Sequence, residues 1–156
     1  MLKMDIPGLG ELHLSHAIFD FNGTLAIEGQ LIDGIAERLN RLSERIQLHI
    51  ITGDSFGKAK SELADINCKL TILPGENQAI AKKNYLQALD PKEVVAIGNG
   101  RNDQYMLKEA ALGIAVIGSE GTAIEALLAA NIIMPDIDSV LDTLLHQKRL
   151  IATLRT

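Results

Sequence analysis

The sequence predicts an α/β fold in three layers, with a Rossmann-like central parallel sheet covered by helices on both faces. From Ala17 onward, short apolar segments alternate with amphipathic segments, which is the pattern of strands joined by right-handed helical crossovers. Three of the apolar segments end in polar turns that contain glycine, and open α/β sheets bind their ligands at the carboxyl ends of the strands. We therefore expect one domain over residues 1–156, with a ligand site at these turns.

Composition narrows the class of protein. Hydrophobic residues make up 47% of the chain and aromatic residues only 3%, so the core must consist mainly of aliphatic side chains, as in a sheet covered on both faces. The net charge of -5 argues against binding to nucleic acid or to an anionic membrane surface. No apolar run reaches membrane-spanning length, and the single cysteine, Cys68, excludes an internal disulfide. We expect a cytoplasmic protein.

The first third of the chain predicts a hairpin, a small β-flap and one helix. The hairpin consists of residues 3–6 and 11–16, on either side of a Pro-Gly turn, and leads into the central strand. The flap consists of residues 25–27 and 30–32 and closes with a glycine turn. Asp33 is expected to cap the helix, whose apolar stripe is Ile35, Leu39 and Leu42.

The rest of the chain alternates between strands and helices. The expected strands are 17–20, 46–51, 70–73, 94–97, 113–117 and 132–134. The first expected helix of this part is capped by Asp54 or Ser55 and ends near residue 63. Further helices are expected over 78–89, 104–111 and 122–130, and a last helix from about residue 137. The intervals between these elements are too short for a separate cap domain.

Polar residues at three strand ends have the chemistry of phosphoryl transfer. Asp20 ends a buried strand, and the glycine turn after it lets backbone amides point at an anion. A plain Asx turn is the simpler alternative for this segment. Thr52 adds a hydroxyl near further amides, and the loop Gly98–Asp103 adds acidic and amide oxygens for Mg²⁺. Phosphoryl transfer needs these parts because its catalysis is mainly positioning and charge neutralisation.

These segments resemble a known family, the haloacid dehalogenase-like hydrolases, and within it the phosphorylation domain of P-type ATPases. Asp20–Leu25 is similar to D-K-T-G-T-L, Ile51–Asp54 to the T-G-D segment, and Gly98–Asp103 to G-D-G-x-N-D. The stretch Leu112–Gly118 is similar to the ATPase segment around G-I-A-M-G. The resemblance covers nearly all of the chain after Ala17, and four motifs in the same order make it specific.

The resemblance assigns a role to each matching residue. Asp20 is expected to be the nucleophile that forms an aspartyl-phosphate. A lysine on the helix before the Gly98 loop neutralises the phosphate in this family, and Lys82 is the choice, with Lys83 as its competitor. The implied phosphate contacts are Gly23, Thr24, Thr52, Gly53, Lys82 and Asn102. The implied Mg²⁺ ligands are Asp20, the backbone carbonyl of Asn22, Asn99 and Asp103.

Two residues depart from the family pattern. Phosphatases of the family usually have a second Asp two residues after the nucleophile, where it protonates the leaving group, and this chain has Asn22. An amide cannot supply that proton, and general acid–base catalysis contributes about two to four orders of magnitude. Hydrolysis is therefore expected to be slow, or to need a good leaving group such as an acyl phosphate. Asn99 replaces a metal-binding Asp, which leaves the Mg²⁺ site with less negative charge.

The resemblance implies a capless, Mg²⁺-dependent phosphohydrolase that acts on a small phosphorylated substrate. The alternative is a catalytically impaired module that binds phosphate or regulates a partner, and a third possibility is a phosphoryl-accepting domain like a response regulator. Because no segment of the chain is long enough to close over the site, we expect a homo-oligomer, a tetramer or dimer, with its interface near Ala26–Leu31.

Overall fold

Six parallel strands form the central sheet of the computed structural model, which describes residues 1–156. The strands lie in the order β10-β9-β8-β3-β6-β7, and each neighbouring pair is parallel. Their bounds are β3 His16–Asp20, β6 Gln47–Thr52, β7 Lys69–Ile72, β8 Val94–Gly98, β9 Leu112–Val116 and β10 Ile132–Met134. The predicted fold class is confirmed.

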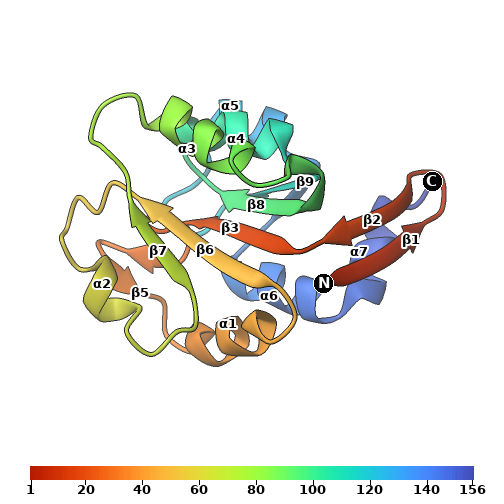
Figure 1. The fold of residues 1–156 in the computed structure, drawn as a ribbon, viewed down its shortest axis with the longest axis horizontal. Coiled ribbons are helices and arrows are strands. Elements are labelled where there is room, and N and C mark those ends of the chain that lie inside the picture. The colour runs from red at the N-terminus through yellow and green to blue at the C-terminus, as the bar shows by residue number, and fades with distance from the viewer.

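Helices cover both faces of this sheet (Figure 1). One layer contains α3 Gln78–Gln87, α4 Gln104–Glu109 and α5 Ile124–Ala129. The layer on the opposite face contains α1 Ile35–Ser43 and α6 Ile137–Leu145, which pack against each other. The short helix α2 Ala59–Glu62 lies between β6 and β7 in the sequence. No helix combines the length and the apolar character that crossing a bilayer requires.

Side chains of β3 alternate between two apolar cores. Phe19 packs in the larger core together with Leu39 of α1 and Val140 of α6, whereas Ile18 packs in the smaller core with Leu86 of α3. The strand is apolar along most of its length because both of its faces are buried. Burial of one such large side chain stabilises the fold by roughly 1.5–3 kcal/mol. The end of β3 is therefore a firmly held position for the polar residue that follows.

The hairpin and the flap form as expected. Strands β1 Leu2–Ile6 and β2 Gly10–Leu14 pair antiparallel, and so do β4 Ala26–Ile27 and β5 Gln30–Leu31. In Figure 1 the hairpin projects from the sheet at the end opposite to the carboxyl ends of the strands, and the last helix, α7 Gln147–Leu154, packs against β1. The hairpin therefore extends the core and lies away from the predicted site.

Three predicted helix boundaries are wrong. Asp33 does not cap α1, because the N-cap is Gly34 with a φ of +82° and no side-chain capping bond. The predicted single last helix is two helices, since the backbone leaves the helical region at His146, with a ψ of 73°, between α6 and α7. Helix α2 begins only at Ala59, and Asp54 Oδ1 accepts hydrogen bonds from the backbone N–H groups of Lys58 and Ala59.

Candidate active site

Three loops meet at one edge of the sheet because their strands are neighbours. Strand β3 lies between β6 and β8, and Asp20 is in register with Ile51 while Phe19 is in register with Ile97. The three strands therefore end at the same level, and the turns that follow them begin side by side. The structure brings together Asp20, Thr52 and the loop after β8, as the sequence analysis expects.

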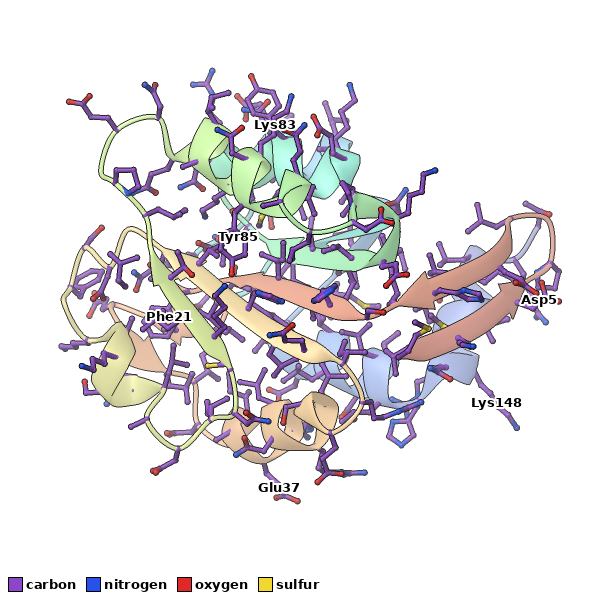
Figure 2. All side chains as sticks on the ribbon, in the orientation of Figure 1. Asp5, Phe21, Glu37, Lys83, Tyr85 and Lys148 are labelled. Carbon is purple, nitrogen blue, oxygen red and sulfur yellow. The ribbon has the colours of Figure 1, made fainter.

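The turn after β3 is tight and depends on glycine. The carbonyl of Phe21 accepts hydrogen bonds from the N–H groups of Leu25 and Ala26, both at 2.9 Å, and Gly23 N–H donates to the carbonyl of Ala26 at 2.7 Å. Gly23 has a φ of +83°, a region that side chains other than glycine rarely enter. The side chain of Phe21 is fully buried at the end of β3 (Figure 2), which anchors the turn.

Lys82 is buried between two carboxylates. Its Nζ donates hydrogen bonds to Asp20 Oδ1 and to Asp103 Oδ1, each at 2.6 Å. Lys83, the competing residue, instead pairs with Glu109 at 2.9 Å, and Figure 2 shows it on the outer side of α3. The structure therefore places Lys82, and not Lys83, at the predicted nucleophile.

Burial and charge change the acidity of this cluster. Removal from water, together with the negative charge of Asp103, raises the pKa of Asp20 to about 7 even though Lys82 opposes the shift. Burial alone lowers the pKa of Lys82, but the two carboxylates outweigh it and raise that pKa above its ordinary value. The lysine is therefore a fixed positive charge at the floor of the site.

Asp103 supports the loop after β8 from below. Its Oδ2 accepts hydrogen bonds from the backbone N–H groups of Asn99 at 3.0 Å and Gly100 at 2.8 Å, and its Oδ1 accepts from Lys82. The residue is fully buried, and a Cβ on Gly98 would overlap its carboxylate. Both oxygens of this predicted Mg²⁺ ligand are thus already engaged by donors of the protein.

Asn99 joins three segments of the site. Its Oδ1 accepts a long hydrogen bond, 3.4 Å, from Thr24 Oγ1, and its Nδ2 donates to the carbonyl of Gly121 at 3.1 Å. The same Thr24 hydroxyl lies 3.3 Å from Asp20 Oδ2. The side-chain Oδ1 of Asn99 therefore shares the Thr24 hydroxyl with the carboxylate of Asp20, and this long bond satisfies it only weakly.

The opposite wall of the site contains Thr52 and Asn102. Thr52 is almost fully buried, and its Oγ1 accepts a hydrogen bond from the backbone N–H of Asp54 at 2.9 Å. Asn102 Nδ2 donates to Gln78 Oε1 at 2.9 Å, and Asn102 Oδ1 lies 3.4 Å from Lys82 Nζ. Gln78, at the first position of α3, is a site residue that the sequence analysis misses.

A small polar cavity of about 240 Å³ opens above these groups. Its volume suits a phosphoryl group with a small substituent. Its lining contains no hydrophobic residue and consists of Asp20, Asn22, Thr52, Gly53, Ser55, Gln78, Asn99, Gly100, Asn102 and Glu120. Glu120, in the loop after β9, is a second missed residue, and Asp103 lies beneath this lining and is not part of it.

The oxygen atoms of this cavity suit a hard cation such as Mg²⁺. The side-chain Oδ1 of Asn22 is buried without any hydrogen-bond partner, and Asn99 Oδ1 has only its long bond from Thr24. Carboxylate and amide oxygens are the ligands that Mg²⁺ accepts, usually with several waters retained. No group of three or more His, Cys, Asp and Glu side chains is arranged to hold a metal, so such a site has few charged ligands.

Comparison with known proteins supports the family resemblance. A family model described as haloacid dehalogenase-like hydrolase matches residues 77–140. An uncharacterised protein of Methanocaldococcus jannaschii is 45% identical over 83 residues, which are 51% of this chain and 89% of that protein.

Two relatives with a named activity come from Archaeoglobus fulgidus. A probable copper-exporting P-type ATPase is 33% identical over 109 residues, 67% of this chain and 13% of the ATPase. A phosphoserine phosphatase is 35% identical over 74 residues, 47% of this chain and 20% of the phosphatase. The matches to these longer proteins thus cover only a small part of their length.

Solved structures share the fold along almost the whole chain. A 3-deoxy-D-manno-octulosonate 8-phosphate phosphatase from Moraxella catarrhalis, in complex with magnesium, phosphate and its sugar, has a TM-score of 0.71 and 19% identity, with 92% of this chain and 94% of that chain covered. The cobalt-bound enzyme of Haemophilus influenzae has a TM-score of 0.72 and 16% identity, with the same coverage. At this identity the likeness establishes the fold.

The fold and the ordered motifs agree with these matches. The chain is similar to the haloacid dehalogenase-like hydrolases over residues 77–140, and to a P-type ATPase over 109 residues.

Proposed function

We propose that the chain is a Mg²⁺-dependent phosphohydrolase that forms an aspartyl-phosphate on Asp20 and acts on a small phosphorylated substrate. The observation that carries this proposal is the buried Lys82, which holds Asp20 at 2.6 Å at the floor of a polar cavity. A buried ammonium beside a buried carboxylate at a ligand-binding edge of the sheet is the arrangement of a phosphoryl-transfer site.

The residues of the cavity have separate roles in the proposed reaction. Thr52, the amide of Gly53, Asn102 and Lys82 orient and neutralise the phosphoryl oxygens, with Gly23 and Thr24 shaping the turn below them. A carboxylate oxygen of Asp20 forms a bond to phosphorus while the bond from phosphorus to the leaving group breaks. Water then attacks phosphorus, the bond to Asp20 breaks, and inorganic phosphate leaves as Asp20 regains its carboxylate.

The residues that would hold Mg²⁺ are Asp20, the backbone carbonyl of Asn22 and Asn99. When bound, the ion neutralises charge on the phosphoryl oxygens. Asp103 differs from our expectation as a ligand, since its two oxygens accept hydrogen bonds from Lys82 and from two backbone amides. Its proposed role is to fix Lys82 and the loop that presents Asn99.

The leaving group sets the speed of the proposed reaction. Asn22 has no proton to give, so an alkoxide leaving group must take its proton from water. Acyl phosphates avoid this requirement because a carboxylate leaves without protonation. We therefore propose that acyl phosphates and other activated phosphates are hydrolysed faster than alkyl phosphates.

A second candidate is a phosphate-binding or regulatory module without turnover. The observation in its favour is that amides, Asn22 and Asn99, stand at two positions where the resemblance leads us to expect carboxylates. This module would bind phosphate and Mg²⁺ in the same cavity and release no product.

Assembly and location complete the proposal. The flap exposes Ile27, and the loop beside it exposes Phe56, whose Cβ lies against Gly29. We propose that a second copy of the chain covers these residues in a cytoplasmic homo-oligomer, because no segment of the same chain covers the cavity.

The test is a phosphate-release assay over alkyl, aryl and acyl phosphates, with and without Mg²⁺, on the wild type and Asp20→Asn. We expect Mg²⁺-dependent turnover that is fastest on acyl phosphates and is lost in Asp20→Asn. Unchanged turnover in Asp20→Asn would exclude the aspartyl-phosphate mechanism. Binding of phosphate without turnover on any substrate would favour the second candidate.

A further inference from the structure

Glu120 is the one carboxylate of the cavity lining besides Asp20. Asp20 is already paired with Lys82, whereas the ion pairs of the structure do not involve Glu120. Its carboxylate is thus available to a ligand in the cavity. No motif of the sequence analysis contains it, because it lies in the loop between β9 and α5.

Glu120 and Asn99 converge on one point of the site. A Cβ on Gly23 would lie 2.7 Å from Glu120 Oε2, 2.8 Å from Asn99 Oδ1 and 2.6 Å from Asn99 Nδ2. Gly23 is therefore the residue over which the two side chains meet. The neighbouring Asn22, whose backbone carbonyl is a proposed cation ligand, also has a buried side-chain Oδ1 without a hydrogen-bond partner.

The segment just after Glu120 is hydrogen-bonded to both the side chain and the backbone of Asn99. Asn99 Nδ2 donates to the carbonyl of Gly121, and the backbone N–H of Ala123 donates to the carbonyl of Asn99 at 2.9 Å. Gly118 N–H also donates to the carbonyl of Pro135 at 2.9 Å, which holds the start of the loop. An Asp at position 99 would have no N–H for Gly121, so the amide that removes charge from position 99 also holds Glu120 in place.

We propose that Glu120 is a ligand of the cation site, bound directly or through a water, and that it supplies the negative charge that Asn99 lacks. The proposal rests on the proposed function, since it concerns the same Mg²⁺ site. A dication bound at Asp20, Asn22 and Asn99 alone would have one carboxylate, which Lys82 already partly neutralises. Glu120 restores the second carboxylate, and affinity for hard cations rises with ligand charge.

The test is cation binding to the whole protein, measured by calorimetry with Mg²⁺ and by electron paramagnetic resonance with Mn²⁺ at constant salt. Glu120→Gln should weaken both affinities by about tenfold or more, the usual size of such losses around a metal. The matched control is Glu125→Gln, because Glu125 is a partly exposed carboxylate that pairs with Arg101 and lies outside the cavity. The cation affinity of this variant should equal that of the wild type. The double variant Glu120→Gln/Asn99→Asp, with the charge returned to position 99, should regain most of the lost affinity.

The affinity for inorganic phosphate gives a second readout, because the effect of Glu120→Gln on it should reverse when Mg²⁺ is added. Without a dication, Glu120→Gln should bind phosphate more tightly than the wild type, because one negative charge is gone. With saturating Mg²⁺ for the wild type, the variant should bind phosphate more weakly. The opposite order, or no difference, would overturn the proposal.

The outcomes separate this inference from the proposed function. Equal cation affinity in the wild type and Glu120→Gln, with Asp20-dependent turnover, would overturn the role of Glu120 and leave the proposed reaction standing. A Glu120→Gln variant with lost turnover and unchanged cation affinity would make Glu120 an acid or base, and would likewise overturn this proposal. A wild type that binds neither cation would overturn both.

Discussion

Lys82 reaches across the site from α3 to Asp20 at the end of β3, and the two charged groups meet at 2.6 Å with almost no exposure to solvent. They are 62 positions apart in the sequence. The adjacent Lys83 is on the other side of the same helix, where it pairs with Glu109. This difference between two neighbouring lysines makes a controlled experiment possible.

Lys82→Met should be strongly destabilised and inactive, whereas Lys83→Met should be close to the wild type. The first change leaves two buried carboxylates without their cation, and breaking a buried ion pair in this way costs about 3–5 kcal/mol. The second removes a half-exposed pair worth about 1 kcal/mol or less. Denaturant unfolding and phosphate release would measure both effects. Similar losses in the two variants would argue against a special role for Lys82.

Asn22→Asp should raise turnover on alkyl phosphates by about two to four orders of magnitude, the usual contribution of general acid–base catalysis. The increase should be much smaller for acyl phosphates, whose leaving groups need no proton. Steady-state rates on one substrate of each kind would measure the difference. An equal change on both substrates would show that residue 22 does not act on the leaving group.

Gly23→Ala and Gly29→Ala should lose similar stability and differ in cation binding. Both glycines have a positive φ, +83° and +77°, and in both cases a Cβ would meet a neighbouring side chain. The left-handed backbone alone costs an L-residue about 1–2 kcal/mol. At Gly23 the added methyl also displaces Asn99 and Glu120, so Mg²⁺ affinity should fall in this variant alone. Calorimetry at a temperature where both variants are folded is the measurement.

The unfolding free energy should contain an acid-sensitive contribution from His49. This side chain is buried against His16, at 3.0 Å, and Tyr85, at 2.9 Å, and Lys69 lies over the Tyr85 ring. Burial first, and then the positive charges of His16 and Lys69, lower the pKa of His49 from 6.5 to about 4. The unfolded chain therefore binds more protons between these values, and the contribution of His49 to stability, present above pH 6.5, is lost as the pH falls toward 4.

A comparison of the wild type with His49→Gln isolates this effect. The raised pKa of Asp20 acts in the opposite direction, because the folded protein then binds the extra proton, but Asp20 is present in both proteins. Between pH 7 and pH 5 the wild type should lose stability relative to His49→Gln, by at most about 1.4 kcal/mol per pH unit. Parallel curves from urea titrations would contradict the assignment.

The proposed interface at the flap predicts which apolar surface residue matters for assembly. Ile27→Glu should dissociate the oligomer, because a charge at a buried contact is costly. Leu128→Glu on α5 should have no effect on assembly, although Leu128 is more exposed, at 77% against 41% for Ile27. Sedimentation at micromolar concentration would test both. A monomeric wild type would remove the idea that a second copy covers the cavity.

The order of strands and the place of the site follow from local patterns in the sequence. The apolar segments that end in Asp20, in Thr52 and in the Gly98 loop can be recognised without a structure. A buried strand requires apolar residues, and the turn that follows it requires glycine and polar residues. The choice between Lys82 and Lys83 is not visible in this way. A lysine interrupts the apolar pattern of a helix whether its charge is buried or exposed. Which of the two lysines is buried depends on the charged partners that other elements bring to it.

Roles that depend on distant contacts could not be predicted. Asp103 matches a ligand position in its motif, but the structure shows both of its oxygens held by Lys82 and by the loop it supports. Glu120 and Gln78 belong to no periodic pattern. They line the cavity because the loop after β9 and the start of α3 both come to it. The break at His146 likewise has no glycine or proline to signal it.

The two carboxylates of the cavity are held with very different firmness. Asp20 ends β3, which is hydrogen-bonded to β6 on one edge and to β8 on the other, so its backbone is released only when the sheet opens. Glu120 is on an exposed loop that a few hydrogen bonds fasten, and such segments open at much lower free energy than a central strand. On warming, amide exchange should therefore quicken in residues 117–121 well before β3. Cation affinity should decline over the temperature range in which this loop opens, while the sheet is still fully formed.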